Sequence, residues 1–382
     1  MTRSPAILLL GIPPSILCGI DLLSFTTSPN FHGIKDLPPG FHFLFTSETS
    51  SLSIRDGFWF HVPDTTSQSD PLIVYKWDPK QGCLTAVEYP ETYQSTLSEL
   101  WERGLSPYRQ SADKESTESG DWHGLTTHIK PSVLDFLTQS KGWNATSASC
   151  AKEDVDHIPG LSDEEAGVAH ELGVLGINLK KTWPENAVGR ERTDAALDRS
   201  YALADIVKRR QGEDGEWGDV ILGQMEACFV MVLTISNYSC LEEWKRCLEL
   251  ILTCVSAVRL REKFFTDVIA LLNRQMRRCE DVEGGLFDLS DAGGLLKLWL
   301  KGFRRNIDRV FAPSEGEDLK EEMRELESTL KEMYGWELSD DFVRKGTLQL
   351  EDGETIEMEV SGMDEEDESG EYAPVVVDLD NG

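Results

Sequence analysis

The spacing of apolar residues changes from strand-like to helical partway along this 382-residue chain. Over the first ninety residues, short apolar runs are separated by proline and glycine, which is typical of strands joined by turns. From Thr193 onward, apolar residues recur every three or four positions, the period of amphipathic helices. We therefore predict an α+β fold, with an N-terminal antiparallel β-rich domain followed by an all-helical C-terminal domain.

The same patterns give expected elements and boundaries. Strands are predicted over 6–10, 16–20, 41–46, 58–62, 72–77 and 83–89, and accessory helices over 92–103 and 131–137. Helices of the second domain are predicted over 195–210, 219–235, 241–258, 260–278, 292–311 and 318–334. We expect domains at 1–138 and 193–336, joined by a polar, irregular linker at 139–192 and followed by a tail at 337–382.

The tail combines high acidity with two strand-forming patterns. Between Gly346 and Gly382 there are thirteen acidic residues and no Lys or Arg, so mutual repulsion favours a flexible segment. Alternating residues on both sides of Asp352-Gly353 predict a hairpin over 347–360. The peptide Ala373-Pro374-Val375-Val376-Val377-Asp378-Leu379 alternates in the way a strand does when it adds to an exposed sheet edge, so we predict that these residues bind a partner. A frayed terminus without a partner is the alternative.

The net charge of -31 argues against direct nucleic-acid binding, which depends on Lys and Arg neutralising phosphates. Residues 312–382 alone hold 24 acidic and 5 basic side chains. The basic clusters Lys208-Arg209-Arg210, Arg277-Arg278 and Arg304-Arg305 fall in or near the last turns of predicted helices, where cations complement the helix dipole. No apolar window is long enough to span a membrane without charge.

The eight cysteines include no C-x-x-C pair, so we expect no zinc, no other metal and no cofactor. Cys240, Cys247 and Cys254 recur every seven residues, which predicts one buried helical face and favours a reducing compartment. His170-Glu171 lacks the second histidine of a metalloprotease helix, and no nucleophile elbow, Walker A loop or dinucleotide fingerprint is present. We expect no catalytic residues and no enzyme activity, although a triad assembled in space stays open at this point.

Several blocks in order resemble a known family. They are Gly19-Ile20-Asp21, Phe31-His32-Gly33-Ile34-Lys35, Leu37-Pro38-Pro39-Gly40-Phe41-His42-Phe43-Leu44, Leu105-Ser106-Pro107-Tyr108, Trp122-His123-Gly124-Leu125-Thr126, Ser200-Tyr201-Ala202-Leu203, Glu242-Glu243-Trp244-Lys245-Arg246-Cys247-Leu248 and the closing Ala373 to Leu379. Together they are similar to the A1 cistron-splicing factors, assembly chaperones of the U5 snRNP. The chain departs from the family pattern at Phe25, where tryptophan is expected, and at the hairpin over 347–360, which looks inserted.

The resemblance implies a non-enzymatic role in pre-mRNA splicing. Members of the family bind the large scaffold protein of the U5 snRNP through its RNase H-like and Jab/MPN-like domains, exclude the helicase that later occupies the scaffold, and leave in a step linked to phosphorylation. It implies a protein that is monomeric when free and occurs in cytoplasm and nucleus. A different class stays open: a helical adaptor of membrane traffic resembling the VHS type, with the tail as a sorting peptide.

Ser162 is the candidate phosphorylation site. It lies in the expected linker and is followed by Asp163, Glu164 and Glu165, the surroundings that acid-directed kinases prefer. The spacing of Ser162 and Glu165 equally fits a capping box, in which the serine and the glutamate satisfy backbone N–H groups at the start of a helix. The sequence leaves both interpretations open.

Overall fold

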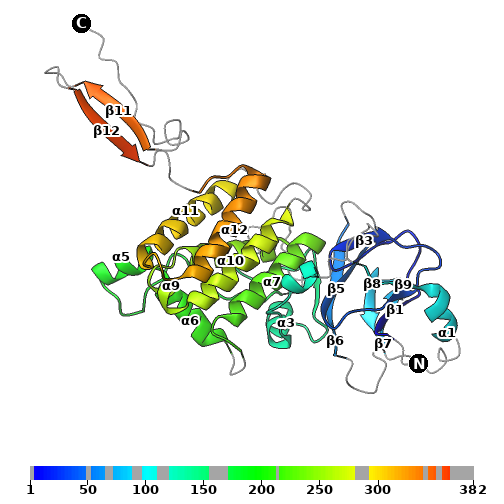
Figure 1. The fold of residues 1–382 in the computed structure, drawn as a ribbon. Coiled ribbons are helices and arrows are strands. Elements are labelled where there is room, and N and C mark those ends of the chain that lie inside the picture. The colour runs from blue at the N-terminus through cyan, green and yellow to red at the C-terminus, as the bar shows by residue number, and fades with distance from the viewer. Residues whose placement is uncertain are drawn as a thin grey trace, which may run out of the picture. The chain divides into compact units, whose positions relative to one another are not determined.

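The protein is described from a computed structural model that covers residues 4–48, 53–64, 72–87, 97–109, 120–154, 171–211, 215–279, 292–338, 343–349 and 355–361. The chain forms two compact units, Met1–Gly335 and Trp336–Gly382. The first unit contains a β-rich part and a helical part, and the second contains a hairpin (Figure 1). The α+β architecture predicted from the sequence is confirmed.

The β-rich part consists of two five-stranded sheets (Figure 1). In spatial order, the first sheet is β8 (Cys83–Ala86), β7 (Leu72–Asp78), β1 (Ala6–Leu10), β4 (Gly33–Lys35) and β9 (Leu105–Pro107). The second sheet is β10 (Asn144–Thr146), β6 (Arg55–Val62), β5 (Gly40–Ser47), β2 (Leu17–Ile20) and β3 (Leu23–Thr26). Residues of both sheets form one buried core, including Ile7, Leu44, Phe58 and Trp77.

Strand β1 is buried on both faces, which explains its uninterrupted apolar run. Ile7 and Leu9 join the core between the sheets, whereas Leu8 packs with Val74 and Leu105 on the other face. The second sheet has the expected antiparallel pairing, whereas this sheet is mixed, because β1 pairs with β7 in parallel and β4 pairs with β9 in parallel. The chain between β1 and β7 passes through five strands, four of them in the second sheet, and β7 then returns beside β1 in the same direction.

The backbone at Gly33 leaves no room for a side chain. Its φ of +141° is a conformation that residues with a Cβ rarely adopt, and a Cβ there would lie 2.0 Å from the carbonyl oxygen of Ile7. The glycine therefore lets β4 approach β1 closely enough to pair with it.

Short helices follow the strands. They are α1 (Leu97–Glu99), the π-helical turn η2 (Leu100–Gly104), α2 (Gly120–Gly124) and α3 (Pro131–Thr138). Longer helices are α5 (Arg190–Leu197), α6 (Ser200–Arg210), α7 (Asp219–Ile235), α8 (Tyr238–Leu252), α9 (Ser256–Leu260), α10 (Glu262–Met276), α11 (Ala292–Val310) and α12 (Glu317–Tyr334). Each predicted helix of the second domain is present, with the segment over 195–210 divided between α5 and α6 and that over 241–258 divided between α8 and α9.

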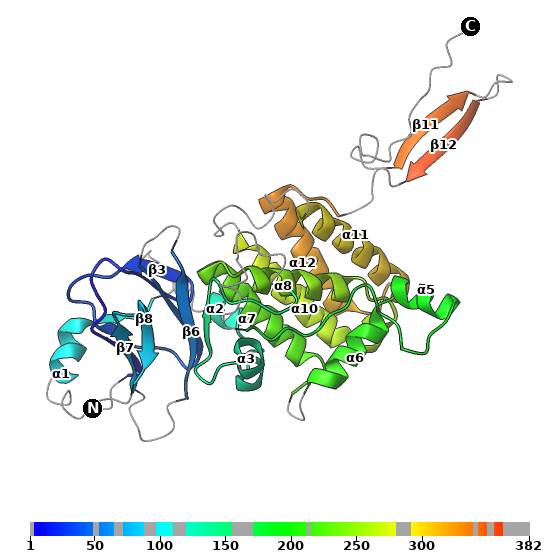
Figure 2. The same ribbon diagram turned by 180° about the vertical axis from the view of Figure 1, so that it is seen from behind.

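Helix α7 lies where the helical part meets the β-rich part (Figures 1 and 2). It contacts α3, α6, α8 and α10, and it also reaches strands β5 and β6. Nearly all of its residues are buried, which accounts for its lack of a polar face. Among the aromatic residues of the helical part, Phe229, Trp244, Phe264 and Phe265 are buried, whereas Trp217 and Trp299 are half-buried.

The second unit contains the predicted hairpin. Strand β11 (Val343–Gln349) pairs antiparallel with β12 (Thr355–Ser361), from Gln349 opposite Thr355 to Val343 opposite Ser361. The two strands lie on either side of Asp352-Gly353, as the turn pattern predicts.

Candidate interaction sites

Both site predictions made from the sequence lie outside the described residues. The peptide 373–379 belongs to the part of the tail that follows β12, and Ser162 belongs to the segment between 154 and 171. They stay predictions. The described residues instead show an open sheet edge, a buried histidine cluster and a polar junction between the two parts of the first unit.

Strand β3 is the last strand of its sheet in the described part of the chain. Beside it lies an apolar pocket of about 430 Å³, which we call the edge pocket. Its lining includes Leu23, Phe25, Ile34, Pro107, Tyr108 and Arg109. The edge pocket therefore lies between the terminal strands of the two sheets, β3 and β9.

Tyr108, one wall of the edge pocket, is held by a buried cluster. Its hydroxyl donates to Asp21 Oδ2 at 2.5 Å, and His42 Nδ1 lies 2.7 Å from the same oxygen. The other Asp21 oxygen accepts from the Phe43 N–H at 2.9 Å. Asp21 is 1% exposed and has a φ of +55°, so the turn after β2 presents its carboxylate to three donors inside the core.

Both ring nitrogens of His42 face hydrogen-bond acceptors, an arrangement that favours the protonated form. His42 Nε2 lies 2.8 Å from the carbonyl oxygen of Pro38, which can only accept a hydrogen bond, so Nε2 carries a proton. Nδ1 donates to the Asp21 carboxylate, which also accepts from Tyr108. Burial by itself would lower the pKa of His42, but the Asp21 charge and hydrogen bond raise it above its usual value.

His42 and Asp21 are the residues to compare with a triad assembled in space, which the sequence left open. His42 and Asp21 resemble the base and orienting acid of a catalytic triad, but His42 is 1% exposed and both of its ring nitrogens are engaged. The third group is a tyrosine whose hydroxyl bonds to the acid and not to the histidine. The geometry therefore braces the turn over 36–40 against β2, and it offers no free base at His42. Sequence reasoning missed the cluster because its members are 21 and 87 positions apart.

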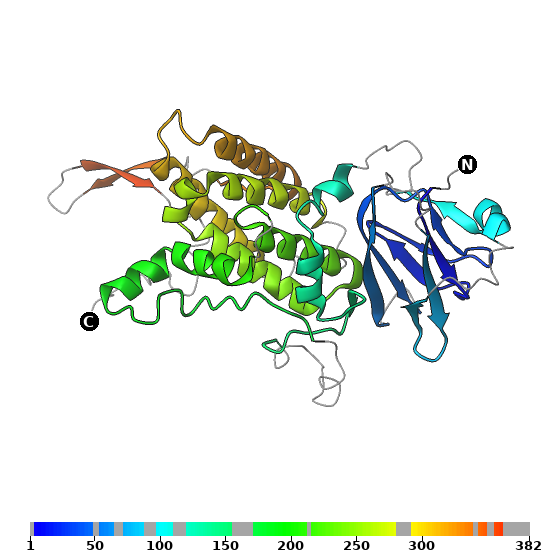
Figure 3. The same cartoon turned by 90° about the horizontal axis from the view of Figure 1, so that it is seen from below.

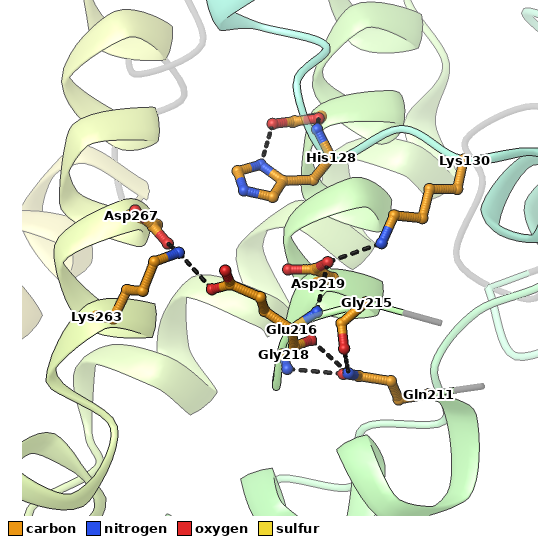
Figure 4. Close-up of polar contacts among 10 residues, drawn as sticks. His128, Lys130, Gln211, Gly215, Glu216, Gly218, Asp219, Lys263 and Asp267 are labelled. Carbon is orange, nitrogen blue, oxygen red and sulfur yellow. Dashed lines mark hydrogen bonds and ion pairs between the residues drawn. The ribbon is translucent and has the colours of Figure 1, made fainter. Parts of the chain in front are cut away.

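A polar junction joins the segment before α3 to the start of α7 (Figure 4). His128 donates from Nδ1 to one oxygen of Glu226 and from its backbone N–H to the other, both at 2.7 Å. Lys130 Nζ donates to Asp219 Oδ2 at 2.7 Å, and that oxygen also accepts from the Glu216 N–H at 2.9 Å. Asp219 is the first residue of α7, where a negative charge is stabilised by the helix dipole.

The junction shifts the pKa values of its members. Burial raises the pKa of Glu226, and hydrogen bonds from His128 oppose that effect only in part. Burial would lower the pKa of His128, but the hydrogen bond and charge of Glu226 raise it on balance. Partial burial would raise the pKa of Asp219, but Lys130 and the Glu216 N–H lower it on balance. On the exposed side of the junction, Lys263 pairs with both Glu216 and Asp267 (Figure 4).

The described parts of the expected linker pack against α7 and α8. Arg246 on α8 donates to both oxygens of Asp154, at 2.8 and 3.2 Å, and to Glu243 at 3.2 Å. The buried Glu243 accepts in turn from the Leu175 N–H at 2.6 Å. Figure 3 shows the chain that leads into α5 running alongside the helices.

The β-rich part is tied to the end of α7 as well. Arg55 on β6 donates to the Thr234 carbonyl at 2.9 Å. The Asn237 side chain donates to the carbonyls of Thr146 and Ser149 and accepts from the Cys240 N–H, which caps α8. Asn237 is 1% exposed, so these three hydrogen bonds lie inside the folded protein.

All eight cysteines lie in the described ranges and are free thiols. Seven are buried, including Cys240, Cys247 and Cys254, so the predicted burial of these three is confirmed. Within the described residues, His, Cys, Asp and Glu form no group suited to holding a metal ion. The helices of the described ranges include none that is both long and apolar enough to cross a membrane.

Two family models match the chain in consecutive regions. The model of the AAR2 N-terminal domain matches residues 3–139, and the model of the AAR2 C-terminal repeat region matches residues 175–339. The protein AAR2 homolog of Caenorhabditis elegans is 26% identical over 374 residues, which is 89% of this chain and 97% of that protein. The protein AAR2 homolog of Homo sapiens is 23% identical over 306 residues, 71% of this chain and 74% of that protein.

Proposed function

The chain belongs to the AAR2 family, the A1 cistron-splicing factors, and we propose that it binds the large scaffold protein of the U5 snRNP and keeps the helicase off it. The family gives the coarser role, an assembly factor of the U5 snRNP in pre-mRNA splicing. The proposal adds the partner surfaces, namely the RNase H-like and Jab/MPN-like domains, and release by phosphorylation. The observation that carries it is the match of both family regions, in order, over most of the chain.

The character of the first unit supports a binding role. Its two parts are joined by partly buried polar contacts, Arg55 to Thr234 and His128 to Glu226, so they present one preorganised surface to a partner. The net charge of -31 disfavours RNA as that partner and favours protein. Helicase exclusion then needs only that two footprints on the scaffold overlap.

The terminal peptide 373–379 is the segment of this chain that would add as a strand to a sheet of the scaffold. In an extended chain, Val375, Val377 and Leu379 share one face, and the backbone of the residues between them can pair with a sheet edge of the scaffold. Val376→Pro removes an N–H donor and restricts φ, so it should weaken scaffold binding by about tenfold or more, whereas Val376→Thr should be mild. Isothermal calorimetry with a scaffold fragment that contains both domains measures this difference.

The tail and the whole complex have separate tests. Removing residues 371–382 should weaken binding without changing the melting temperature of the first unit. If Val376→Pro and Val376→Thr both bind like the wild type, strand addition is wrong. Affinity purification followed by mass spectrometry should recover the scaffold without the helicase. Recovery of membrane-coat proteins in place of the scaffold would support the adaptor alternative.

A further inference from the structure

We propose that the β3 edge, Leu23–Thr26 with the edge pocket beside it, is a second docking site for the scaffold and pairs with an extended segment of that protein. The segment would alternate apolar and polar residues and carry one acidic side chain. The inference rests on the proposed function, because its occupant is the same scaffold.

The backbone of β3 has donors facing outward. Just past the strand, the Thr27 N–H donates to the Ile16 carbonyl at 2.9 Å, toward β2. Because N–H groups alternate between the two sides of a strand, those of Ser24 and Thr26 face away from β2. Both residues are exposed, so an incoming strand can pair with the outward N–H groups of Ser24 and Thr26.

The two terminal strands beside the pocket are not equivalent. On β9, the Tyr108 N–H donates to Lys35 toward β4, so position 107 faces the open side of that strand. Position 107 is proline, which has no N–H and blocks strand addition there. Strand β3, with the sequence Leu-Ser-Phe-Thr, has neither a proline nor a charge, the devices that usually protect an edge. The unprotected edge is therefore the one suited to pairing.

The edge pocket supplies specificity for the incoming side chains. Leu23 and Phe25 are half-buried on β3 and line the pocket together with Ile34, so an apolar side chain from the added strand can enter it. Tyr108 forms a fixed wall because Asp21 holds its hydroxyl. A pocket with fixed walls loses little entropy on binding.

Arg109 determines which charge is favoured in the segment that binds the edge pocket. It is exposed, lines the pocket, and has no ion-pair partner among the described residues. A cation at the rim of an apolar pocket favours an acidic residue next to the apolar side chains of the added strand. An RNA strand would not fit, because the pocket offers one cation in a chain of strongly negative charge.

The test measures scaffold binding by matched variants of the full chain. Ser24→Pro removes an outward N–H that β2 does not use, and it should weaken binding of the two-domain scaffold fragment about tenfold. Ser24→Thr keeps the N–H and should bind like the wild type. Arg109→Glu should weaken binding by a similar factor, whereas Arg103→Glu, an exposed arginine that does not line the pocket, should not.

A second measurement guards against misfolding of Ser24→Pro. Hydrogen exchange of the Ser24 and Thr26 amides in the wild type should slow in the presence of the scaffold fragment. If the wild type binds the fragment while Ser24→Pro and Arg109→Glu bind equally well and these amides stay unprotected, the inference is wrong and the proposed function stands. If the wild type itself does not bind the fragment, the inference and the proposed function both fail. Protection that rises with protein concentration without the scaffold would indicate a second copy of the chain and overturn the proposal.

Discussion

The Nδ1 atom of His128 lies 2.7 Å from a carboxylate oxygen of Glu226, whose side chain is completely buried in α7. The other oxygen of Glu226 accepts from the His128 backbone N–H, so one carboxylate satisfies two donors of the segment that leads into α3. This pair, 98 positions apart in sequence, ties the segment before α3 to α7. A contact of this kind fixes an orientation that apolar packing alone leaves less specific.

Removing the Glu226 carboxylate should destabilise the fold. We expect Glu226→Ala to lower the free energy of unfolding by about 3 kcal/mol, because two donors lose their acceptor inside the protein. Glu226→Gln keeps an acceptor oxygen and should cost about 1 kcal/mol. Urea denaturation measures both. Glu242→Ala, which breaks a half-exposed pair with Lys245, is the control and should cost less than about 1 kcal/mol. An equal loss for Glu226→Ala and Glu242→Ala would contradict the prediction.

His42 should make stability depend on pH. Its pKa is raised in the folded protein, so below the unfolded value of about 6.5 both states are protonated and the Asp21 pairing contributes fully. As pH rises through the folded pKa, the proton leaves and this contribution is lost, with a slope of at most about 1.4 kcal/mol per pH unit. Besides Asp21, the group facing His42 that can titrate is Tyr108, and Phe60 and Trp122 supply ring contacts.

The measurement compares the wild type with His42→Asn at pH 6, 7, 8 and 9. Asparagine cannot be charged, so the difference in unfolding free energy should be largest at pH 6 and shrink as pH rises. His128 has the same sign of shift and is present in both proteins, so its effect cancels in the difference. A difference that stays constant from pH 6 to 9 would show that His42 is not held as an imidazolium.

The residues before α5 should behave as a packed segment. The N–H groups of Leu172, Gly173 and Leu175 donate to Cys150, Leu137 and Glu243, at 2.9, 2.8 and 2.6 Å. Hydrogen exchange should therefore be slow at these three amides. Fast exchange, comparable to that of an unstructured peptide, would support the simple linker expected over 139–192.

Arg246→Lys should weaken the attachment of this segment. A lysine cannot reproduce the two-pronged contact with Asp154, so we expect a loss of about 1 to 2 kcal/mol in the free energy of unfolding. Arg209→Lys, at an exposed pair with Asp205, is the matched control and should change stability by less than about 0.5 kcal/mol. Similar losses for the two variants would contradict the prediction.

The elements that the sequence predicted well are those whose own pattern determines them. Strand β1 and helix α7 match their predicted ranges because a long apolar run or a helical period leaves few alternatives. The predicted helix over 241–258 is divided because Asp198, 57 positions away, accepts from the N–H groups of Val255 and Ser256. Strands β3, β4 and β9 have three or four residues each and exist only through their neighbours.

A candidate site can be predicted from the sequence only where its residues are neighbours along the chain. The alternation in 373–379 is visible in sequence, but the edge pocket combines residues of β3, β4 and the chain after β9. The Asp21, His42 and Tyr108 cluster likewise depends on the pairing of β2 with β5. Single residues such as Tyr108 and Arg109 carry no sign of these roles, because the roles depend on distances that only the folded sheets establish.

Cysteine reactivity should separate Cys83 from the other seven thiols. Burial raises the pKa of Cys18 to about 12 and that of Cys247 well above its usual value, so neither thiol ionises near neutral pH. Cys83 is half-exposed on β8. Titration with an aromatic disulfide reagent should modify one thiol rapidly in the native protein and all eight in urea. Cys83→Ser should abolish the fast phase, and rapid modification that persists in this variant would contradict the burial pattern.

Ser162 distinguishes a phosphorylation switch from a helix cap. If it is the switch, Ser162→Glu should weaken scaffold binding through added charge, while Ser162→Ala binds like the wild type. If Ser162 and Glu165 form a capping box, Ser162→Ala should cost about 1 kcal/mol of stability and neither variant should change affinity much. Calorimetry with the scaffold fragment and thermal unfolding of each variant separate the two. Phosphopeptide mapping from cells that finds Ser162 unmodified and another serine modified would reject this site and keep phosphorylation-linked release as a proposal.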